Sequence, residues 1–600
     1  FFRKVINMVL SALDWSFVIG FFIISLGIGI WTAKSGNKDA DDYFTASGKM
    51  PWWLLGVSMV ATTFSTDTPN LVTDIVRQNG VSGNWAWWAF LLTGMLTVFV
   101  YARLWKKSGV VTDVEFYELR YSGKIARFLR GFRAIYLGLL FNVMIMATVS
   151  LAAIKIGGVL LGLTPLQTVL IAGTITVIYS SLGGLKGVLI TDFLQFFLSI
   201  GGAFIAAFVA LQHPKVGGLS NLLAHENVAD KLDLFPSPND PEIFIMIFLI
   251  PLLVQWWSVW YPGAEPGGGG YIAQRMFAAK NEDHSIKAVL FFNAAHYALR
   301  PWPWIIVALC SLVVFPDLDS FRTAFPNSES IINHDLGYPA MLTFIPSGLL
   351  GIVVTSLIAA YMSTISTHLN WGASYIVNDF YKRFAKPDAT QKEMLNVGRI
   401  ITVVLMILTM IFALLLDNAL GAFQILLQIG AGTGLIFILR WFWWRVNAAS
   451  ELSAMIVSFA IAIYFGLIHE SLGFAPLADW MQLVIGVGIT TVIWIIVSFV
   501  TTPTNMETMV NFINKVNPGG PGWKSIIAQA KSEGYELTAK TDTWKVPVGI
   551  LCMIAGTVGI YSFLMGTGLF IYGEILNASI LMVLSAISVV VLTKLWPKLS

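Results

Sequence analysis

The 600-residue chain is 56% apolar and 12% charged, whereas soluble domains carry roughly 25% charged residues. So few polar side chains cannot cover a soluble globule, and the composition therefore predicts a membrane protein. The formal net charge is +3, from 37 basic and 34 acidic residues, which gives nucleic-acid binding no electrostatic support. Cys310 and Cys552 are the only cysteines and both lie in apolar runs, which excludes a disulfide scaffold and a thiolate metal cluster.

Runs of about 20 apolar residues can cross a bilayer as helices, in which every backbone polar group is paired internally. The sequence predicts about fifteen such segments, near 14–34, 51–76, 84–104, 127–160, 164–184, 187–211, 243–262, 286–314, 343–380, 397–417, 419–442, 450–469, 478–501, 545–566 and 570–595. The first segment lacks a small-residue cleavage site, so we expect a retained helix and not a signal peptide.

The Lys and Arg residues predict the orientation, because cytoplasmic loops carry the positive excess. The connections 102–133 and 381–399 are rich in Lys and Arg, and both follow odd-numbered segments. The two long connections after even-numbered segments, 212–242 and 315–342, are poor in them. We therefore expect the N-terminus outside and the C-terminus inside, with 502–544 as a cytoplasmic linker before two appended helices.

Two of the apolar segments cannot be continuous helices. In the second, a run of hydroxyl residues and an aspartate precedes Pro69, and proline removes a backbone donor from a helix interior. In the seventh, Pro262, Pro266 and four glycines at 267–270 surround Glu265. These segments are five apart, as in an inverted repeat of five helices, and paired broken helices indicate the central binding site of a transporter. The alternative for either break is a structural proline kink.

The ninth segment carries a patch of hydroxyl side chains. Ser363, Ser366 and Thr367 stand at i, i+3 and i+4, so they share one helix face. Hydroxyl oxygens together with freed carbonyls suit a hard monovalent cation. Alternatively, these hydroxyls bond back to their own helix or permit close helix packing.

Asp192 lies at the start of the sixth segment, where a carboxylate is costly and indicates a functional site by default. Its alternatives are a helix cap or a pair with Lys186. Lys155, inside the fourth segment, is left without a role, because it could snorkel or pair.

Several stretches together resemble the sodium:solute symporter family, which includes sodium-coupled sugar, proline and sialic acid transporters. They are DDYFTASGKMPWWLLGVSMVATTFS, SLGGLKGVLITDFLQFFLSIGG, YIAQRMFAAK and SLIAAYMSTISTHLN with NDFYKR. The resemblance covers about residues 14–500, in order and at suitable separations.

The resemblance implies an all-α polytopic membrane protein with a leucine-transporter-type core of five plus five inverted helices. The implied parts are an N-terminal extra helix (1–50), a first repeat (51–211), an extracellular loop (212–242), a second repeat (243–444), two peripheral helices (445–501), the linker (502–544) and two appended helices (545–600).

The resemblance also implies sodium sites. The commonest site in the family joins carbonyls of the first broken helix to a carbonyl and hydroxyls of the eighth core helix, and the matching residues are Ala61, Phe64, Ala360, Ser363 and Thr364. Some members hold a second sodium, for which the matching residues are Asp192, Ser363, Ser366 and Thr367. We therefore prefer coupling to two sodium ions over one.

The solute pocket departs from the family pattern. Sugar-transporting members use a polar residue, often glutamate, where this chain has the apolar surroundings of Phe90 and Leu91. The candidates for solute binding, taken from the broken helices and the eleventh segment, are Thr63, Thr68, Trp257, Trp260, Tyr261, Glu265, Gln424 and Gln428.

The preferred function is sodium-driven import of a small polar organic solute, a sugar or sugar derivative, by a multi-pass protein of the plasma or inner membrane. The alternatives are an amino acid or small carboxylate as solute, and a symporter-like membrane sensor. An enzyme is disfavoured, because HExxH, GxSxG and a phosphate loop ending in GK[ST] are absent. The oligomeric state is left open.

Overall fold

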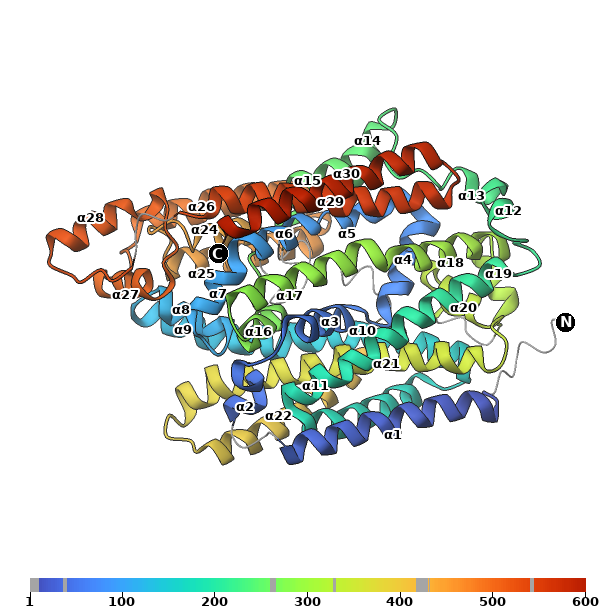
Figure 1. Ribbon diagram of the computed structural model, residues 1–600, viewed down its shortest axis with the longest axis horizontal. Helices are drawn as coiled ribbons and strands as arrows, with labels where there is room; N and C mark the ends of the chain where they lie inside the picture. The colour runs from blue at the N-terminus through green and yellow to red at the C-terminus, as the bar shows by residue number, and fades with distance from the viewer. Residues whose placement is uncertain are drawn as a thin grey trace.

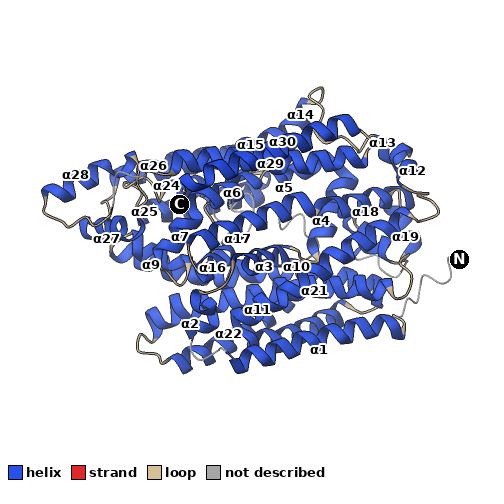
Figure 2. Ribbon diagram, in the orientation of Figure 1, coloured by secondary structure: helices blue, strands red, loops and turns tan. Residues whose placement is uncertain are grey.

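The computed structural model describes residues 10–35, 40–258, 266–326, 331–416, 430, 432–539 and 544–599, and these ranges contain helices and no strand. Most of the helices run along the long axis of the molecule (Figures 1 and 2). The secondary structure thus agrees with the all-helical fold expected from the sequence.

The helices of the first half are α1 (Ala12–Ser35), α2 (Ala40–Thr45), α3 (Trp52–Thr63), α4 (Asp67–Asn79), α5 (Trp85–Trp88), α6 (Leu91–Leu96), α7 (Ala102–Ser108), α8 (Phe116–Arg120), α9 (Gly123–Ile135), α10 (Asn142–Leu161), α11 (Pro165–Leu211), α12 (Leu219–Ala224), α13 (Glu226–Ala229), α14 (Pro241–Phe244) and α15 (Ile250–Leu253). The remaining helices are α16 (Gly270–Ala278), α17 (Glu282–Ala294), α18 (Pro301–Val314), α19 (Leu318–Ala324), α20 (Gly337–Leu342), α21 (Leu349–Tyr375), α22 (Gln391–Ala413), α24 (Gly434–Leu439), α25 (Ala448–Ile463), α26 (Asp479–Val500), α27 (Met506–Val516), α28 (Lys524–Ser532), α29 (Val546–Ile571) and α30 (Ile575–Leu595).

Among the described residues, 11 helices are long and apolar enough to cross a membrane, and three shorter apolar helices span Trp52–Thr63, Pro165–Ser181 and Pro241–Leu253. Each of these falls on one of the predicted segments. The eleventh segment, 419–442, begins in 417–429, which lie outside the described residues. The count of fifteen therefore stays a prediction.

Helix α11 contains the fifth and sixth predicted segments. Its backbone leaves the helical conformation at Gly184, where φ is +55°. Only glycine adopts this conformation without strain from a Cβ. The chain therefore turns between the two segments without a separate loop.

Helix α21 forms the centre of the molecule. Almost every residue from Leu350 to Tyr375 is buried, although the helix carries many polar side chains. It packs against α3, α10, α11 and α22. A helix that is buried on all sides must pair its polar groups with protein partners, and α21 is therefore placed to hold a polar site.

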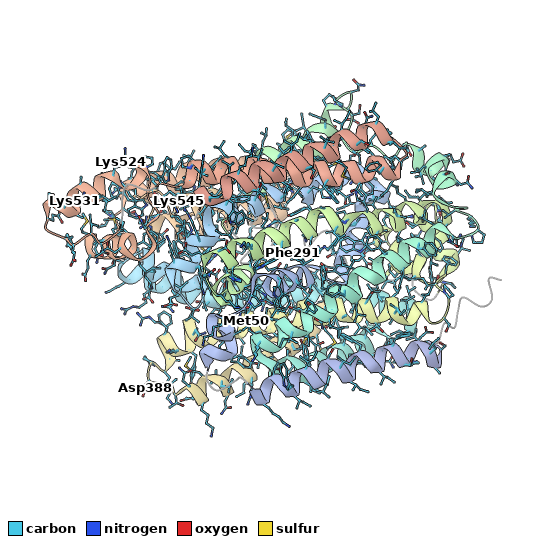
Figure 3. The ribbon with its side chains drawn as sticks, viewed as in Figure 1. Met50, Phe291, Asp388, Lys524, Lys531 and Lys545 are labelled. Atoms are coloured by element: carbon cyan, nitrogen blue, oxygen red, sulfur yellow. The ribbon has the colours of Figure 1, made fainter. Side chains whose placement is uncertain are left out.

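The basic connections lie together at one end of the molecule. Helices α8, α9, α27 and α28 lie at the left end in Figure 1, and α12, α13 and α19 of the two long Lys- and Arg-poor connections lie at the right. Lys524, Lys531 and Asp388 mark the left end in Figure 3. The structure thus separates the two kinds of connection as the sequence analysis expected.

The predicted linker contains two helices, α27 and α28, and is more ordered than its Pro- and Gly-rich sequence indicated. Trp523 is fully buried and donates a hydrogen bond to the Trp441 carbonyl at 2.9 Å. The guanidinium carbon of Arg120 lies 4.7 Å from its ring centroid. These contacts fasten the segment to the rest of the protein.

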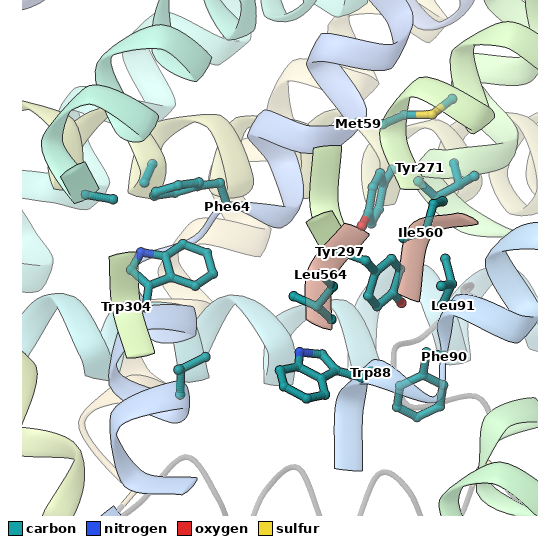
Figure 4. Close-up of a cluster of buried hydrophobic side chains, with 14 of the residues drawn as sticks. Met59, Phe64, Trp88, Phe90, Leu91, Tyr271, Tyr297, Trp304, Ile560 and Leu564 are labelled. Carbon is teal, nitrogen blue, oxygen red and sulfur yellow. The ribbon is translucent and has the colours of Figure 1, made fainter. Parts of the chain in front are cut away.

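The two C-terminal helices pack on the bundle beside the central helices. Tyr561 of α29 donates a hydrogen bond to the Trp88 carbonyl at 2.8 Å, and Trp302 of α18 donates one to the Leu564 carbonyl at 2.9 Å. Figure 4 shows Ile560 and Leu564 next to Tyr297. Helix α29 therefore packs against residues of the central bundle, including Tyr297.

Candidate functional site

The second predicted segment is broken as the sequence indicated. Helix α3 ends at Thr63, Phe64 leaves the helix with φ −89° and ψ +83°, and α4 begins at Asp67. Pro69 occupies the third position of α4, within the first turn, where a missing N–H removes no intrahelical hydrogen bond. The proline thus explains why a new helix starts here.

The carbonyls at the end of α3 are paired by side chains from two other helices. Thr364 of α21 donates a hydrogen bond to the Thr62 carbonyl at 2.7 Å. Arg300, at the start of α18, donates to the Val60 carbonyl at 3.0 Å and to the Thr63 carbonyl at 3.2 Å. A cation is favourable there, because the C-terminal end of a helix carries a partial negative charge.

Arg300 is held in place by aromatic faces. Its guanidinium carbon lies 5.3 Å from the ring centroid of Phe64 and 5.2 Å from that of Trp304. The two rings lie next to each other in Figure 4, in a T-shaped arrangement with centroids 4.9 Å apart. The sequence analysis missed Arg300, since a single arginine before a Pro-Trp-Pro run carries no motif.

The structure brings together the residues expected for the first sodium site. Ala61 and Phe64 lie at the end of α3, which Thr364 of α21 reaches through its hydrogen bond to the Thr62 carbonyl, and Ser363 and Ala360 lie within one turn of Thr364. All five are buried. The junction therefore combines irregular backbone with neutral hydroxyls, which is the chemistry of sodium sites in transporters.

The residues expected for the second sodium site lie next to the first. Ser363 donates a hydrogen bond to Asp192 Oδ1 at 2.6 Å, and Ser58 of α3 donates to Asp192 Oδ2. Thr367 is within 3.0 Å of the Thr62 hydroxyl. Ser366 donates to the Ser363 carbonyl of its own helix at 3.2 Å, which is the alternative role considered for it.

A fifth residue, Arg275 of α16, joins this second group. Its Nη2 donates to Thr367 Oγ1 at 2.8 Å and lies 3.7 Å from Asp192 Oδ2. The expected alternative partner of Asp192, Lys186, instead lies over the Trp31 ring, with its Nζ 6.0 Å from the centroid. The sequence analysis did not connect Arg275 with Asp192, because the two residues lie in different segments.

A cavity of about 110 Å³ opens beside the break. This is below the roughly 300–1,000 Å³ of pockets for drug-sized ligands, so the cavity suits a small solute. It is bounded by hydroxyls, one carboxylate and aromatic rings from several helices, among them Thr62, Thr63, Ser65, Asp67, Thr68, Trp87, Phe90, Thr148, Tyr271, His296, Tyr297 and Thr364.

Of the residues expected to bind the solute, Thr63 and Thr68 line this cavity. Trp257 lies elsewhere: its ring packs on Trp256 with centroids 5.4 Å apart, and its carbonyl lies against Gly434. Trp260, Tyr261, Glu265, Gln424 and Gln428 lie outside the described residues.

The sequence analysis missed several members of the cavity wall. His296 and Tyr297 come from the π-helical segment Ala295–Leu299 before α18, and Tyr271 comes from the start of α16. Asp67 has one carboxylate oxygen, Oδ1, that is buried without a hydrogen-bond partner. Its place in the hydroxyl run before Pro69 was the available signal.

Lys155, which the sequence left without a role, forms a buried ion pair. Its Nζ lies 2.6 Å from Asp335 Oδ2, and the side chains are 2% and 8% exposed. Asp335 lies in the long connection 315–342. The pair therefore ties α10 to that connection and lies outside the set of residues that line the cavity.

With this geometry established, comparison with known proteins identifies the relatives. The model of the sodium:solute symporter family matches residues 43–458. The chain belongs to this family. It is therefore a multi-pass membrane transporter that couples a solute to sodium, and it is not an enzyme.

The chain is 25% identical over 485 residues to the sodium/glucose cotransporter of Vibrio parahaemolyticus, covering 78% of this chain and 87% of that protein. It is 26% identical over 470 residues to the sodium/sialic acid symporter of Proteus mirabilis, covering 74% and 88%. A solved structure of a Na⁺-coupled sialic acid symporter in a substrate-bound outward-open state superposes with a TM-score of 0.63 at 20% identity, covering 82% and 99%. This last likeness shows a shared fold.

Ser363 is the hydroxyl shared by both sodium groups, so its loss is expected to weaken sodium binding most. We expect Ser363→Ala to raise the sodium concentration for half-maximal uptake by about ten-fold, since losing a hydrogen-bond partner of a buried charged group costs about 1–3 kcal/mol. Ser356→Ala, two turns earlier on α21, removes a hydroxyl that bonds its own helix at Val353. Equal sodium dependence in both variants would contradict the assignment.

Proposed function

We propose that the protein imports a sugar or sugar derivative together with sodium, and that the binding site is the junction of the first break with α21. The observation that carries the proposal is the hydrogen bond from Thr364 to the Thr62 carbonyl, which brings the hydroxyls of α21 to the irregular end of α3. A sodium ion bound there would join the two elements through the same oxygens.

The chemistry of the cavity supports a sugar-like solute. Hydroxyls of Thr63, Thr68 and Thr148 can exchange hydrogen bonds with solute hydroxyls, and the rings of Trp87, Tyr271 and Tyr297 offer flat apolar faces. The relatives named as glucose and sialic acid transporters agree with this choice. The apolar Phe90 in the wall distinguishes this cavity from sites that use a glutamate at that position.

An amino acid or small carboxylate is the second candidate. Arg300 lies behind the wall, with Nη2 2.5 Å from His296 Nδ1 and Nη1 3.2 Å from Thr63 Oγ1. A fixed cation this close would favour a solute that carries an anionic group.

The same arrangement favours two sodium ions. One ion would use the carbonyls of Ala61, Phe64 and Ala360 with the hydroxyls of Ser363 and Thr364. The other would use Asp192 with Ser363, Ser366 and Thr367. Shared use of Ser363 would couple the two ions, because each binding event would fix the same side chain.

Alternating access would follow from movement of the two interrupted segments. Sodium would favour the form with α3, α4 and α21 in contact, and the solute would complete the site by ordering residues on both sides of the break. Rocking of one repeat, 51–211, against the other, 243–444, would then expose the site to the opposite side of the membrane.

Thermal stability of the purified protein tests this function directly. A ligand at 100 times its dissociation constant stabilises the folded state by about 2.7 kcal/mol. Sugars, amino acids, carboxylates and quaternary amines would each be added in sodium and in potassium. We expect stabilisation by sugars that requires sodium; stabilisation by carboxylates alone would select the second candidate, and the absence of any sodium effect would contradict the proposal.

We further propose that the protein crosses the membrane about fifteen times, with its N-terminus outside and its C-terminus inside. The gathering of the basic connections at one end supports this orientation. Epitope tags at each terminus would be stained in intact and in permeabilised cells. We expect only the N-terminal tag to be stained in intact cells, and staining of the C-terminal tag there would refute the orientation.

A further inference from the structure

A fixed positive charge lies beside the buried carboxylate of Asp192. Arg275 and Asp192 are both fully buried, and Nη2 of Arg275 lies 3.7 Å from Oδ2 of Asp192. Charges this deep in a membrane protein must be compensated, because an isolated ion there is strongly destabilised. Arg275 is the nearest compensating charge that the described residues show for Asp192.

Arg275 and Asp192 are joined through hydroxyl groups and make no direct hydrogen bond. Buried arginine–carboxylate pairs are commonly bidentate, with two parallel hydrogen bonds of about 2.7–2.9 Å. Here the N–H groups of Arg275 donate to neutral oxygens: Nη2 to Thr367, Nε and Nη2 to Ser58 at 3.2 Å, and Nη1 to Gln274 at 3.0 Å. The carboxylate in turn accepts hydrogen bonds from the hydroxyls of Ser58 and Ser363. Guanidinium and carboxylate therefore share a hydroxyl without a direct hydrogen bond.

The guanidinium also uses oxygens that a second sodium would need. Thr367 Oγ1 accepts its shortest hydrogen bond, at 2.8 Å, and Asp192 supplies the negative charge for both cations. One carboxylate can neutralise one monovalent cation. Binding of sodium while Arg275 stays in place would leave a net positive charge in a buried site, which is strongly unfavourable.

Arg275 is carried by a helix that begins at a run of glycines. Gly267 and Gly268 before α16, and Gly270 at its first position, have φ of +94°, +85° and +54°. Such glycines allow backbone rotation that other residues resist. A small displacement of α16 would withdraw the guanidinium from Thr367 and free the oxygens around Asp192.

We propose that Arg275 is an internal counter-ion that exchanges with the second sodium ion at Asp192, an inference that rests on the proposed sodium-coupled function. When sodium binds, Arg275 moves away with α16. When sodium leaves, Arg275 returns and neutralises Asp192. The transporter without bound sodium or solute can then return to its starting conformation without an uncompensated buried carboxylate. Net transport can therefore continue.

The variant Arg275→Gln removes the competing charge and keeps hydrogen-bonding groups. We expect the sodium concentration for half-maximal thermal stabilisation to fall by about five-fold or more, the range of a typical coupling between two sites. Net uptake should fall while exchange of solute between sodium-loaded compartments is retained, because only the return of the empty carrier is impaired.

Arg440→Gln is the matched control. Arg440 is also buried and lies 3.6 Å from its carboxylate partner, Glu451, and its other contacts, with Tyr117 and Phe116, include no residue of the sodium groups. It should lose thermal stability with no change in the sodium midpoint. The same result for Arg275→Gln would show a purely structural ion pair and overturn the proposal.

The double variant Asp192→Asn/Arg275→Gln tests the same idea if Arg275→Gln does not fold. Removal of both charges should restore net uptake, with a Hill coefficient for sodium near one because only the first ion remains. Uptake with the sodium dependence of the unmodified protein would overturn the proposal. Failure of sodium to stabilise the unmodified protein would instead refute the proposed function itself.

Discussion

The structure depends on how a break in a buried helix is stabilised. A membrane-embedded backbone must satisfy its polar groups within the protein, since lipid offers no hydrogen bonds. The interval between α3 and α4 leaves the Thr62 and Thr63 carbonyls without helical donors, and Thr364 and Arg300 supply donors from two different helices. These contacts hold three elements in register around one point in the bundle.

The polar character of α21 follows from the same requirement. Its hydroxyls face the break on one side and Asp192 on the other, so these polar groups find protein partners at the centre of the bundle. A sodium ion suits this junction because it accepts neutral oxygen ligands and adds charge where a carboxylate is already buried. In the proposed sites, coupling would arise from proximity, because the ions and the solute would contact residues within two turns of the same helices.

Local signals in the sequence were sufficient for the membrane class, the break between α3 and α4 and the hydroxyl face of α21. Pro69 fixed the start of α4 because proline tolerates only the first turn of a helix, and the spacing of Ser363, Ser366 and Thr367 required a common face. The solute cavity was harder to predict, since Tyr271, His296 and Tyr297 reach it through tertiary packing. Trp257 shows the converse, because an aromatic residue near a predicted break packs on a neighbour instead.

The sequence also could not predict which charged residues form pairs over long distances along the chain. Lys155 and Asp335 are 180 residues apart, and Arg275 is separated from Asp192 by several helices. The local sequence around each of these residues does not predict its partner. Burial inside a membrane made a partner necessary, but only the packed structure shows which one.

The most direct test of the central claim is equilibrium binding of radioactive sodium to the purified protein and to its Thr364→Ala variant. The account predicts saturable binding of two ions per chain, with one ion lost in the variant, because Thr364 is proposed to serve only the site at the break. Binding that is unchanged in the variant, or that does not saturate in the unmodified protein, would show that the junction of α3 and α21 is not a sodium site.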